Sequence, residues 1–166
     1  MNQLPSRKSP RAEFHNYSGG KYFVTICTEE MRHFFGRIDC EMMHLSALGE
    51  YCEEQLAEIE QHYSYAVVPL FTVMPNHVHA IICIDGEDND VPAMRTALGV
   101  VIGGLKRAVT LFARRHDIEF AWQGRYHDHI IRNREEGNKI ADYIKNNVAR
   151  WADDRFNPDR IPPRRQ

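Results

Sequence analysis

The sequence lacks the features that mark several common protein classes. Its 166 residues include only four cysteines, and no two of them form a C-x-x-C pair. This spacing argues against a disulfide scaffold and a structural zinc site. No apolar run reaches the roughly 20 residues that a membrane-spanning helix needs, and the charged N-terminus has no apolar core typical of a secretory signal. We therefore expect a cytoplasmic protein with no membrane association.

A net positive charge is also missing. The formal net charge is −2 at pH 7, which by itself argues weakly against binding to nucleic acid. The charges are unevenly distributed, because residues 22–60 hold nine acids and two bases whereas residues 100–134 hold seven bases and three acids. The folded chain could therefore present a basic and an acidic face, although such runs often only solvate surface helices.

The length and the hydrophobic pattern indicate one α+β domain over residues 1–166, with an N-terminal arm at 1–20 and an irregular tail at 152–166. Periodicity and β-branched content predict strands over 21–28, 65–74, 77–84 and 125–132, helices over 46–62, 98–116 and 135–151, and a small hairpin within 33–45. This is the βαββαβ order of a ferredoxin-like sandwich with an antiparallel sheet and one added C-terminal helix. The superfold alone does not indicate a function.

His77 and His79 form the first candidate site. On a strand, residues two apart point to the same face, so both imidazoles can bind one cation. The motif is weak, because a chain with nine histidines often contains an H-x-H by chance. A second one is present at His127 and His129. A structural role therefore remains open for either pair.

Tyr143, on the last expected helix, is a candidate nucleophile. It lies four residues before Asn147, so the two share a helix face. A phenol with its ordinary pKa of about 10 needs a nearby cation or base before it can attack. If this helix packs beside the strand of His77, the Asn147 carbonyl could complete a metal shell. For a tyrosine on an amphipathic helix, however, half-buried packing is the commoner role.

Several segments together resemble one enzyme family. Residues 74–82 are similar to the histidine–hydrophobic–histidine strand of the single-tyrosine HUH transposases. Residues 122–133 and 142–147 closely resemble the REP-associated branch of that family, and residues 7–11 and 22–28 are also similar to it. The resemblance covers nearly the whole chain in the family's order. It implies metal ligation by His77 and His79.

The resemblance further implies that Tyr143 is the nucleophile and that Asn147 is the third ligand to a Mg²⁺ or Mn²⁺ ion. It places His127 and His129 before the tyrosine helix, outside the metal strand. Many relatives have proline after the asparagine, whereas this chain has Val148. The last helix is therefore expected to continue toward residue 151.

The implied reaction is strand transfer on single-stranded or hairpin DNA. The tyrosine displaces a 3′-hydroxyl, holds the 5′ end as a phosphotyrosine, and is released by another 3′-hydroxyl. The candidate DNA contacts are basic residues and one aromatic residue, for which packing is the alternative role. They are Arg7, Lys8, Arg11, Lys106, Arg107, Arg114, Arg115, Trp122, Arg125 and Arg132.

Two other functions remain open at this point. A domesticated relative could bind DNA hairpins with little or no cleavage. A metal-dependent hydrolase using activated water would need a general base near His77 and would not need Tyr143. Both a monomer and a homodimer are compatible with the sequence.

Overall fold

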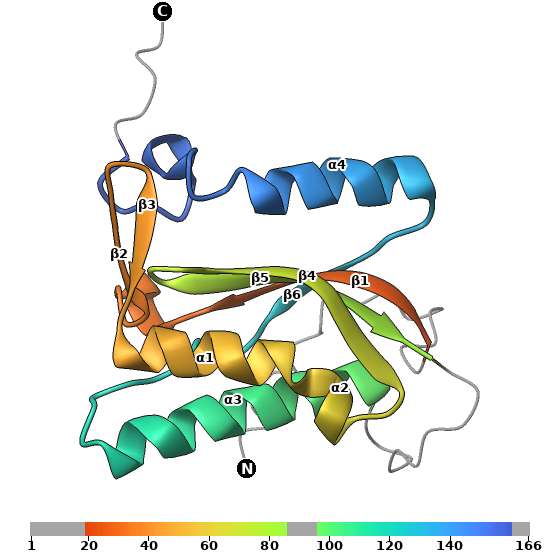
Figure 1. The fold of residues 1–166 in the computed structure, drawn as a ribbon, viewed down its shortest axis with the longest axis horizontal. Helices are drawn as coiled ribbons and strands as arrows, with labels where there is room; N and C mark the ends of the chain where they lie inside the picture. The colour runs from red at the N-terminus through yellow and green to blue at the C-terminus, as the bar shows by residue number, and fades with distance from the viewer. Residues whose placement is uncertain (1–18, 86–95, 161–166) are drawn as a thin grey trace, which may run out of the picture.

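The computed structural model describes residues 19–85 and 96–160, which form a β-sheet with helices on both faces (Figure 1). In chain order the elements are β1 Gly20–Cys27, η1 Glu29–Met31, β2 Gly36–Asp39, β3 Met42–Leu45, α1 Ala47–Ala57, α2 Ile59–His62, β4 Ala66–Met74, β5 His77–Ile84, α3 Ala97–Arg115, β6 His127–Ile130, α4 Arg134–Lys145 and η2 Trp151–Asp153.

The main sheet is antiparallel, with the strand order β4-β5-β1-β6. Helices α1, α2 and α3 cover one face, and α4 crosses the other (Figure 1). The β2–β3 hairpin is inserted between β1 and α1 and stands at one end of the sheet. Without this hairpin and α4, the order is βαββαβ, which confirms the predicted ferredoxin-like fold class.

The hydrophobic core lies between the sheet and the α1–α3 layer. Alternate residues of β1 and β5 supply it, among them Val24, Ile26, Val78 and Ile82, all essentially without solvent exposure. Because side chains alternate along a strand, the intervening residues of β5 point to the face under α4. The strand is buried on both faces, so its second face can hold buried polar side chains as a site.

Helix α4 begins sharply and ends earlier than predicted. The Asn133 side chain caps its start by accepting a hydrogen bond from the backbone N–H of Glu136 at 2.9 Å. The helix ends at Lys145, followed by turns, so the expected extension toward residue 151 is wrong. At this end the Asn146 side-chain amide donates to the Asp142 carbonyl at 2.7 Å, next to the helical hydrogen bond from the Asn146 backbone N–H to the same oxygen.

Other boundaries also differ from the prediction. Strand β6 is shorter than residues 125–132, and β1 already begins at Gly20, inside the expected arm. Residues 1–18 and 161–166 lie outside the described residues. Between 152 and 160 the tail forms the end of η2 followed by turns. In the ranges that the structure describes, no helix is long and apolar enough to cross a membrane.

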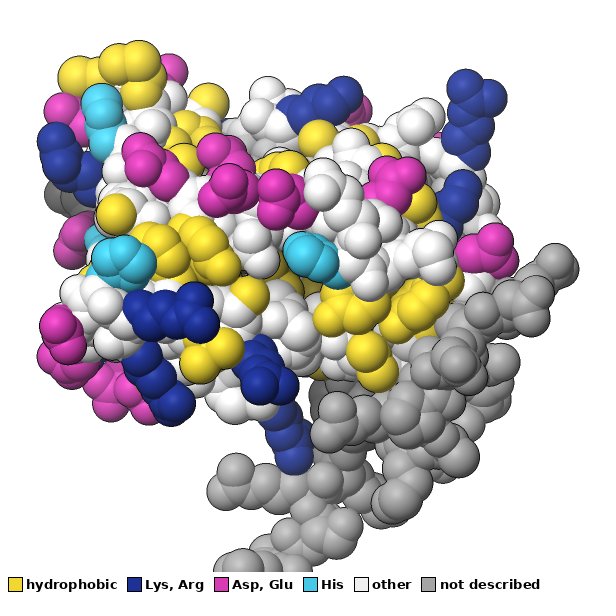
Figure 2. Space-filling view, turned by 60° about the horizontal axis from the view of Figure 1, so that its bottom comes forward, with side chains coloured by type: hydrophobic (Ala, Val, Ile, Leu, Met, Phe, Trp, Pro, Cys, Tyr) yellow, Lys and Arg dark blue, Asp and Glu magenta, His cyan; other side chains and the backbone are white. Residues whose placement is uncertain are grey.

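Acidic and basic side chains occur together on the side of the molecule that α1 and α3 cover, so this side is neither purely acidic nor purely basic. Helix α1 exposes Glu50, Glu53 and Glu54, and its neighbour α3 ends with exposed Arg114 and Arg115. Figure 2, which turns this side forward, shows a band of acidic side chains above a group of Lys and Arg side chains. The basic end of α3 therefore lies on the side of the sheet opposite to α4.

Candidate functional site

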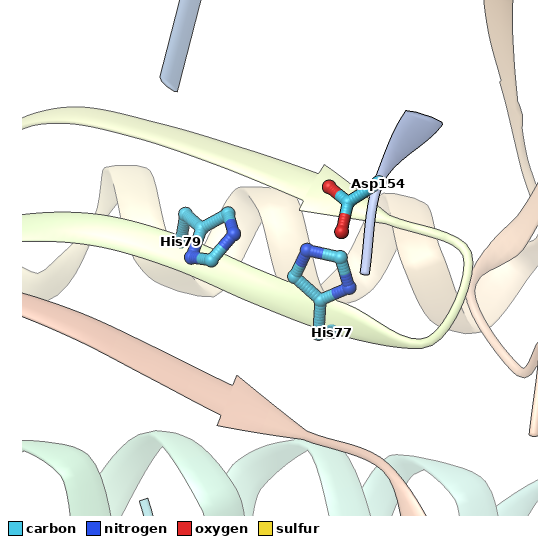
Figure 3. Close-up of side chains that lie close together, drawn as sticks. All are labelled: His77, His79 and Asp154. Atoms are coloured by element: carbon cyan, nitrogen blue, oxygen red, sulfur yellow. The ribbon is translucent and has the colours of Figure 1, made fainter. Parts of the chain in front are cut away.

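His77 and His79 lie side by side on β5, on the sheet face under α4 (Figures 1 and 3). Their relative exposures are 0% and 1%, and their ring centroids are 4.5 Å apart. The sequence prediction that the two imidazoles share a face is confirmed. Two imidazoles that are shielded from solvent need polar partners, because a buried polar group without a hydrogen bond destabilises the fold.

Each imidazole is held at its Nδ1 atom. His77 Nδ1 lies 2.8 Å from the Asn76 side-chain oxygen, and His79 Nδ1 lies 2.9 Å from the Thr25 hydroxyl. The amide oxygen can only accept, so His77 donates from Nδ1–H and keeps a lone pair on Nε2. The same tautomer in His79 places its Nε2 lone pair beside that of His77. Such outer partners orient metal-binding histidines.

Asp154 completes a cluster that the sequence interpretation did not include. One ligand atom each from Asp154, His77 and His79 lie within 4.8 Å of one another, and Figure 3 shows the carboxylate facing the two rings. Asp154 is 8% exposed and accepts a hydrogen bond from the Phe156 backbone N–H at 2.8 Å. It belongs to the expected irregular tail, where no periodicity or motif distinguishes it from its neighbour Asp153.

Two buried polar atoms beside this cluster lack partners within the described part of the chain. They are His77 Nε2 and the side-chain oxygen of Asn147. Each unsatisfied atom costs about 1–3 kcal/mol, so such atoms indicate a missing ligand or water. Imidazole nitrogen, amide oxygen and carboxylate are suitable ligands for a divalent metal. These residues therefore fit a cation.

Tyr143 on α4 adjoins the same histidines. Its hydroxyl lies 3.3 Å from His79 Nε2, and its ring packs edge-on against Phe23 at 6.1 Å. Burial raises the pKa of the Tyr143 phenol, and the Asp154 carboxylate adds to this rise. A hydrogen bond with Asn147 and the charge of Arg155 oppose it. The phenol thus stays protonated until a further cation compensates for burial.

The two histidines are neutral in this environment. Burial lowers the pKa of His79 to about 3, and the nearby positive charge of Arg155 contributes. Burial also lowers the pKa of His77, with further contributions from His79 and Arg155. Neutral imidazole is the form that binds metals. The two histidines can therefore bind a cation without first releasing protons.

The metal-free protein is expected to lose stability as the pH falls below 6.5. Unfolded histidine has a pKa near 6.5, above the folded values, so the unfolded state takes up protons first. The free energy of unfolding should then fall by about 1.4 kcal/mol per pH unit for each histidine. For His79 this trend continues toward pH 3. Urea denaturation in EDTA between pH 6.5 and 5 measures this slope.

The variant His79→Gln is the matched control for this slope. Glutamine does not titrate in this range, so the histidine contribution to the slope should fall by about half. A wild-type free energy of unfolding that stays constant from pH 6.5 to 5 would contradict buried, neutral histidines.

A pocket of about 390 Å³ opens beside Tyr143 and Asn147. Three arginines line it, namely Arg150, Arg155 and Arg160, and all three are exposed. Guanidinium groups are well suited to phosphate oxygens. The sequence interpretation did not include these arginines, although their density after residue 149 was a visible signal.

The residues predicted to contact DNA lie in different parts of the molecule, and not all of them are near Tyr143. Arg7, Lys8 and Arg11 lie outside the described residues. The four basic candidates on α3 are on the sheet side away from Tyr143 (Figure 1): they are Lys106, Arg107, Arg114 and Arg115. Arg125 and Arg132 flank β6. A DNA-binding role for each of them stays a prediction.

Trp122 is packed into the protein instead of standing free on its surface. Its ring lies 5.3 Å from that of Phe35 and 5.1 Å from that of Phe120, centroid to centroid. Its indole N–H donates to the Lys106 carbonyl at 3.1 Å. These contacts agree with the packing role considered from the sequence, and base stacking by Trp122 stays a prediction.

The second H-x-H motif is separate from the metal cluster. His129, on β6, is exposed and lies 2.6 Å from the Glu136 carboxylate of α4. His127 is also exposed. Neither belongs to the cluster of His77, His79 and Asp154.

Comparisons with known proteins agree with this architecture. No protein-family model matches the chain. It is 33% identical to an uncharacterized protein of Haemophilus influenzae, over 92% of this chain and 94% of that protein. Its fold is similar to that of a REP-associated tyrosine transposase bound to a REP hairpin, with a TM-score of 0.63 and 17% identity. That match covers 86% of this chain and 74% of the solved one.

Proposed function

The chain belongs to the same family as the uncharacterized Haemophilus influenzae protein, and from its transposase-like fold and its site we propose that it is a DNA strand transferase. In this proposal it is a metal-dependent transposase that cleaves and rejoins single-stranded DNA at hairpins. The reaction proceeds through a 5′-phosphotyrosine on Tyr143. The similar solved protein, which is bound to a REP hairpin, supports hairpin DNA as the substrate.

The position of Tyr143 beside two orphaned buried ligand atoms is the observation that carries the proposal. Its hydroxyl is 3.3 Å from His79 Nε2, while His77 Nε2 and the Asn147 oxygen have no partner in the described residues. A packing tyrosine would not need such neighbours. We assign His77, His79 and Asn147 as metal ligands, and the position of Asp154 makes it a fourth candidate.

The site residues have distinct tasks in this reaction. A bound Mg²⁺ or Mn²⁺ ion would supply Lewis acidity toward the scissile phosphate. Tyr143 attacks phosphorus through its phenol oxygen, the 3′-hydroxyl leaves, and the tyrosine becomes joined to the 5′ phosphate. The arginines of the neighbouring pocket hold phosphate oxygens. A new 3′-hydroxyl then reverses the step, so no ATP is consumed.

We expect the double variant Arg155→Gln/Arg160→Gln to slow cleavage by about 10-fold or more, because charge-assisted phosphate contacts are lost. Both side chains are exposed, so folding should be unaffected. Initial cleavage rates on labelled hairpin DNA measure the effect. Arg37→Gln, an exposed arginine on the β2–β3 hairpin, is the control. If the double variant and Arg37→Gln lost the same fraction of the cleavage rate, Arg155 and Arg160 would have no specific role in phosphate binding.

The proposed function is tested by incubating the protein with labelled hairpin DNA and Mg²⁺ or Mn²⁺. Hairpins from the DNA flanking the native gene are the first substrates to try. A covalent protein–DNA adduct on a denaturing gel is the expected result. A protein that binds these hairpins tightly but forms no adduct with either metal would instead be a DNA-binding member of this fold.

A further inference from the structure

A second pocket, of about 710 Å³, lies at the opposite end of α4 from Tyr143. It forms where the first turns of α4 pass over the ends of β1, β4 and β5. Its volume is in the range of small-molecule sites. None of the residues that line it takes part in the proposed cleavage chemistry, although Arg132 is among the predicted DNA contacts.

The lining divides into an apolar part and a cationic part. Ile81, Cys83 and Ile131 give it an apolar floor. Lys21, Arg132 and Arg134 contribute three positive charges, and all three side chains are exposed. A ligand that fits both parts has a weakly polar body and an anionic group.

Lys21 and Arg134 have no acidic partner among the described residues, whereas Arg132 interacts electrostatically with the Glu136 carboxylate. The lining described for this pocket contains no Asp or Glu. The nearby Glu136 carboxylate is already engaged, accepting from the Arg132 backbone N–H at 2.8 Å and lying 2.6 Å from His129. Within residues 19–85 and 96–160, Lys21 and Arg134 form no salt bridge. The cations are therefore available to an anion.

We propose that this pocket binds a nucleoside monophosphate unit, with its phosphate on Lys21, Arg132 and Arg134 and its base on the apolar floor. The Asn138 amide and the amino group of Asn133, whose oxygen caps α4, can meet the polar edge of a base. The unit belongs to an unpaired stretch of a DNA strand or to a free nucleotide. Only the preference for a DNA strand rests on the proposed function.

Alkylation of Cys83 tests the proposal on the wild-type protein. Cys83 lines the pocket, whereas Cys40 is exposed on the β2–β3 hairpin and serves as an internal reference. The protein is treated with iodoacetamide in EDTA, with dAMP, a ten-residue thymidine oligonucleotide or inorganic phosphate. At about ten times its dissociation constant, a bound ligand should slow Cys83 alkylation by about 10-fold and leave Cys40 unchanged.

Each result has a distinct meaning. Protection by both dAMP and the oligonucleotide supports a nucleotide pocket, and protection by the oligonucleotide alone identifies a DNA strand as the source. Protection by inorganic phosphate equal to that by dAMP would reduce the pocket to a simple anion site and overturn the proposal. Absence of protection at saturating concentrations would overturn it too. Because EDTA removes metal, none of these results depends on cleavage at Tyr143.

Charge removal provides an independent check. The variant Lys21→Gln/Arg134→Gln should weaken the binding of dAMP or the oligonucleotide by about 10-fold or more, whereas Lys139→Gln should not. Lys139 is an exposed residue of the same helix, bonded to Glu135 and outside the pocket lining. Burial raises the pKa of the Cys83 thiol and the charge of Lys21 partly offsets this rise, so for each variant the ratio of alkylation rates with and without ligand is compared. Equal binding by the two variants would contradict the assigned phosphate position.

Discussion

Replacing Tyr143 by phenylalanine is expected to abolish the covalent adduct and to reduce hairpin cleavage by at least about 1000-fold, because loss of a nucleophile removes most of the catalysis. The substitution deletes one oxygen and keeps the edge-on contact of the ring with Phe23. DNA binding and stability should therefore change little. Adduct formation on a denaturing gel and binding by fluorescence anisotropy measure the two properties separately.

The control for this prediction is Tyr63→Phe. Tyr63 is also half-buried, but it packs against α3 on the other side of the sheet. This variant should retain wild-type cleavage. If Tyr143→Phe also retained cleavage, a hydrolase with activated water would be the better account. Asp154 would then be the general base that such an enzyme requires, and its carboxylate already faces the two histidines (Figure 3).

The second large effect is expected on metal binding in the variant His77→Ala. Outer partners of metal ligands typically change affinity 10- to 100-fold, so loss of the ligand itself should cost at least about 100-fold. In the wild-type protein, Mn²⁺ at about 100 times its dissociation constant should stabilise the fold by about 2.7 kcal/mol. Thermal unfolding with and without Mn²⁺ measures this difference. In His77→Ala the same Mn²⁺ concentration should stabilise the fold by no more than about 0.4 kcal/mol.

His129→Ala provides the matched control, because His129 belongs to the second H-x-H motif but is exposed and paired with Glu136. It should keep the full stabilisation by Mn²⁺. Each protein is compared with its own metal-free form, so any loss of packing in His77→Ala cancels. Equal stabilisation of His77→Ala and wild type would show that the metal binds elsewhere.

Much of the fold and part of the site could be predicted from local patterns. The β-branched and aromatic residues of β1 and the apolar run of β5 predicted these strands, and the two-residue spacing of His77 and His79 placed both rings on one face. These features depend on the period of a strand, which is independent of the rest of the chain. The order of strands and helices along the chain predicted the ferredoxin-like fold class.

The contribution of the tail could not be predicted in the same way. Asp154 approaches the histidines because the chain turns back after α4, and Asn76 fixes this path by donating to the Phe156 carbonyl at 2.8 Å. That bond joins residues 80 positions apart, so no local pattern reports it. The end of α4 was also missed, because propensity alone allowed the helix to continue past Lys145, where the chain instead enters turns at Asn146.

The central claim is that Tyr143 forms the covalent bond to DNA, and mass spectrometry of the trapped adduct tests it most directly. Trypsin should release residues 140–145 as one peptide that contains Tyr143 as its only tyrosine. After nuclease digestion of the DNA, we predict that this peptide carries a 5′-linked nucleotide on its phenol oxygen. A nucleotide on any other residue, or an unmodified peptide in protein that has cleaved DNA, would contradict the account.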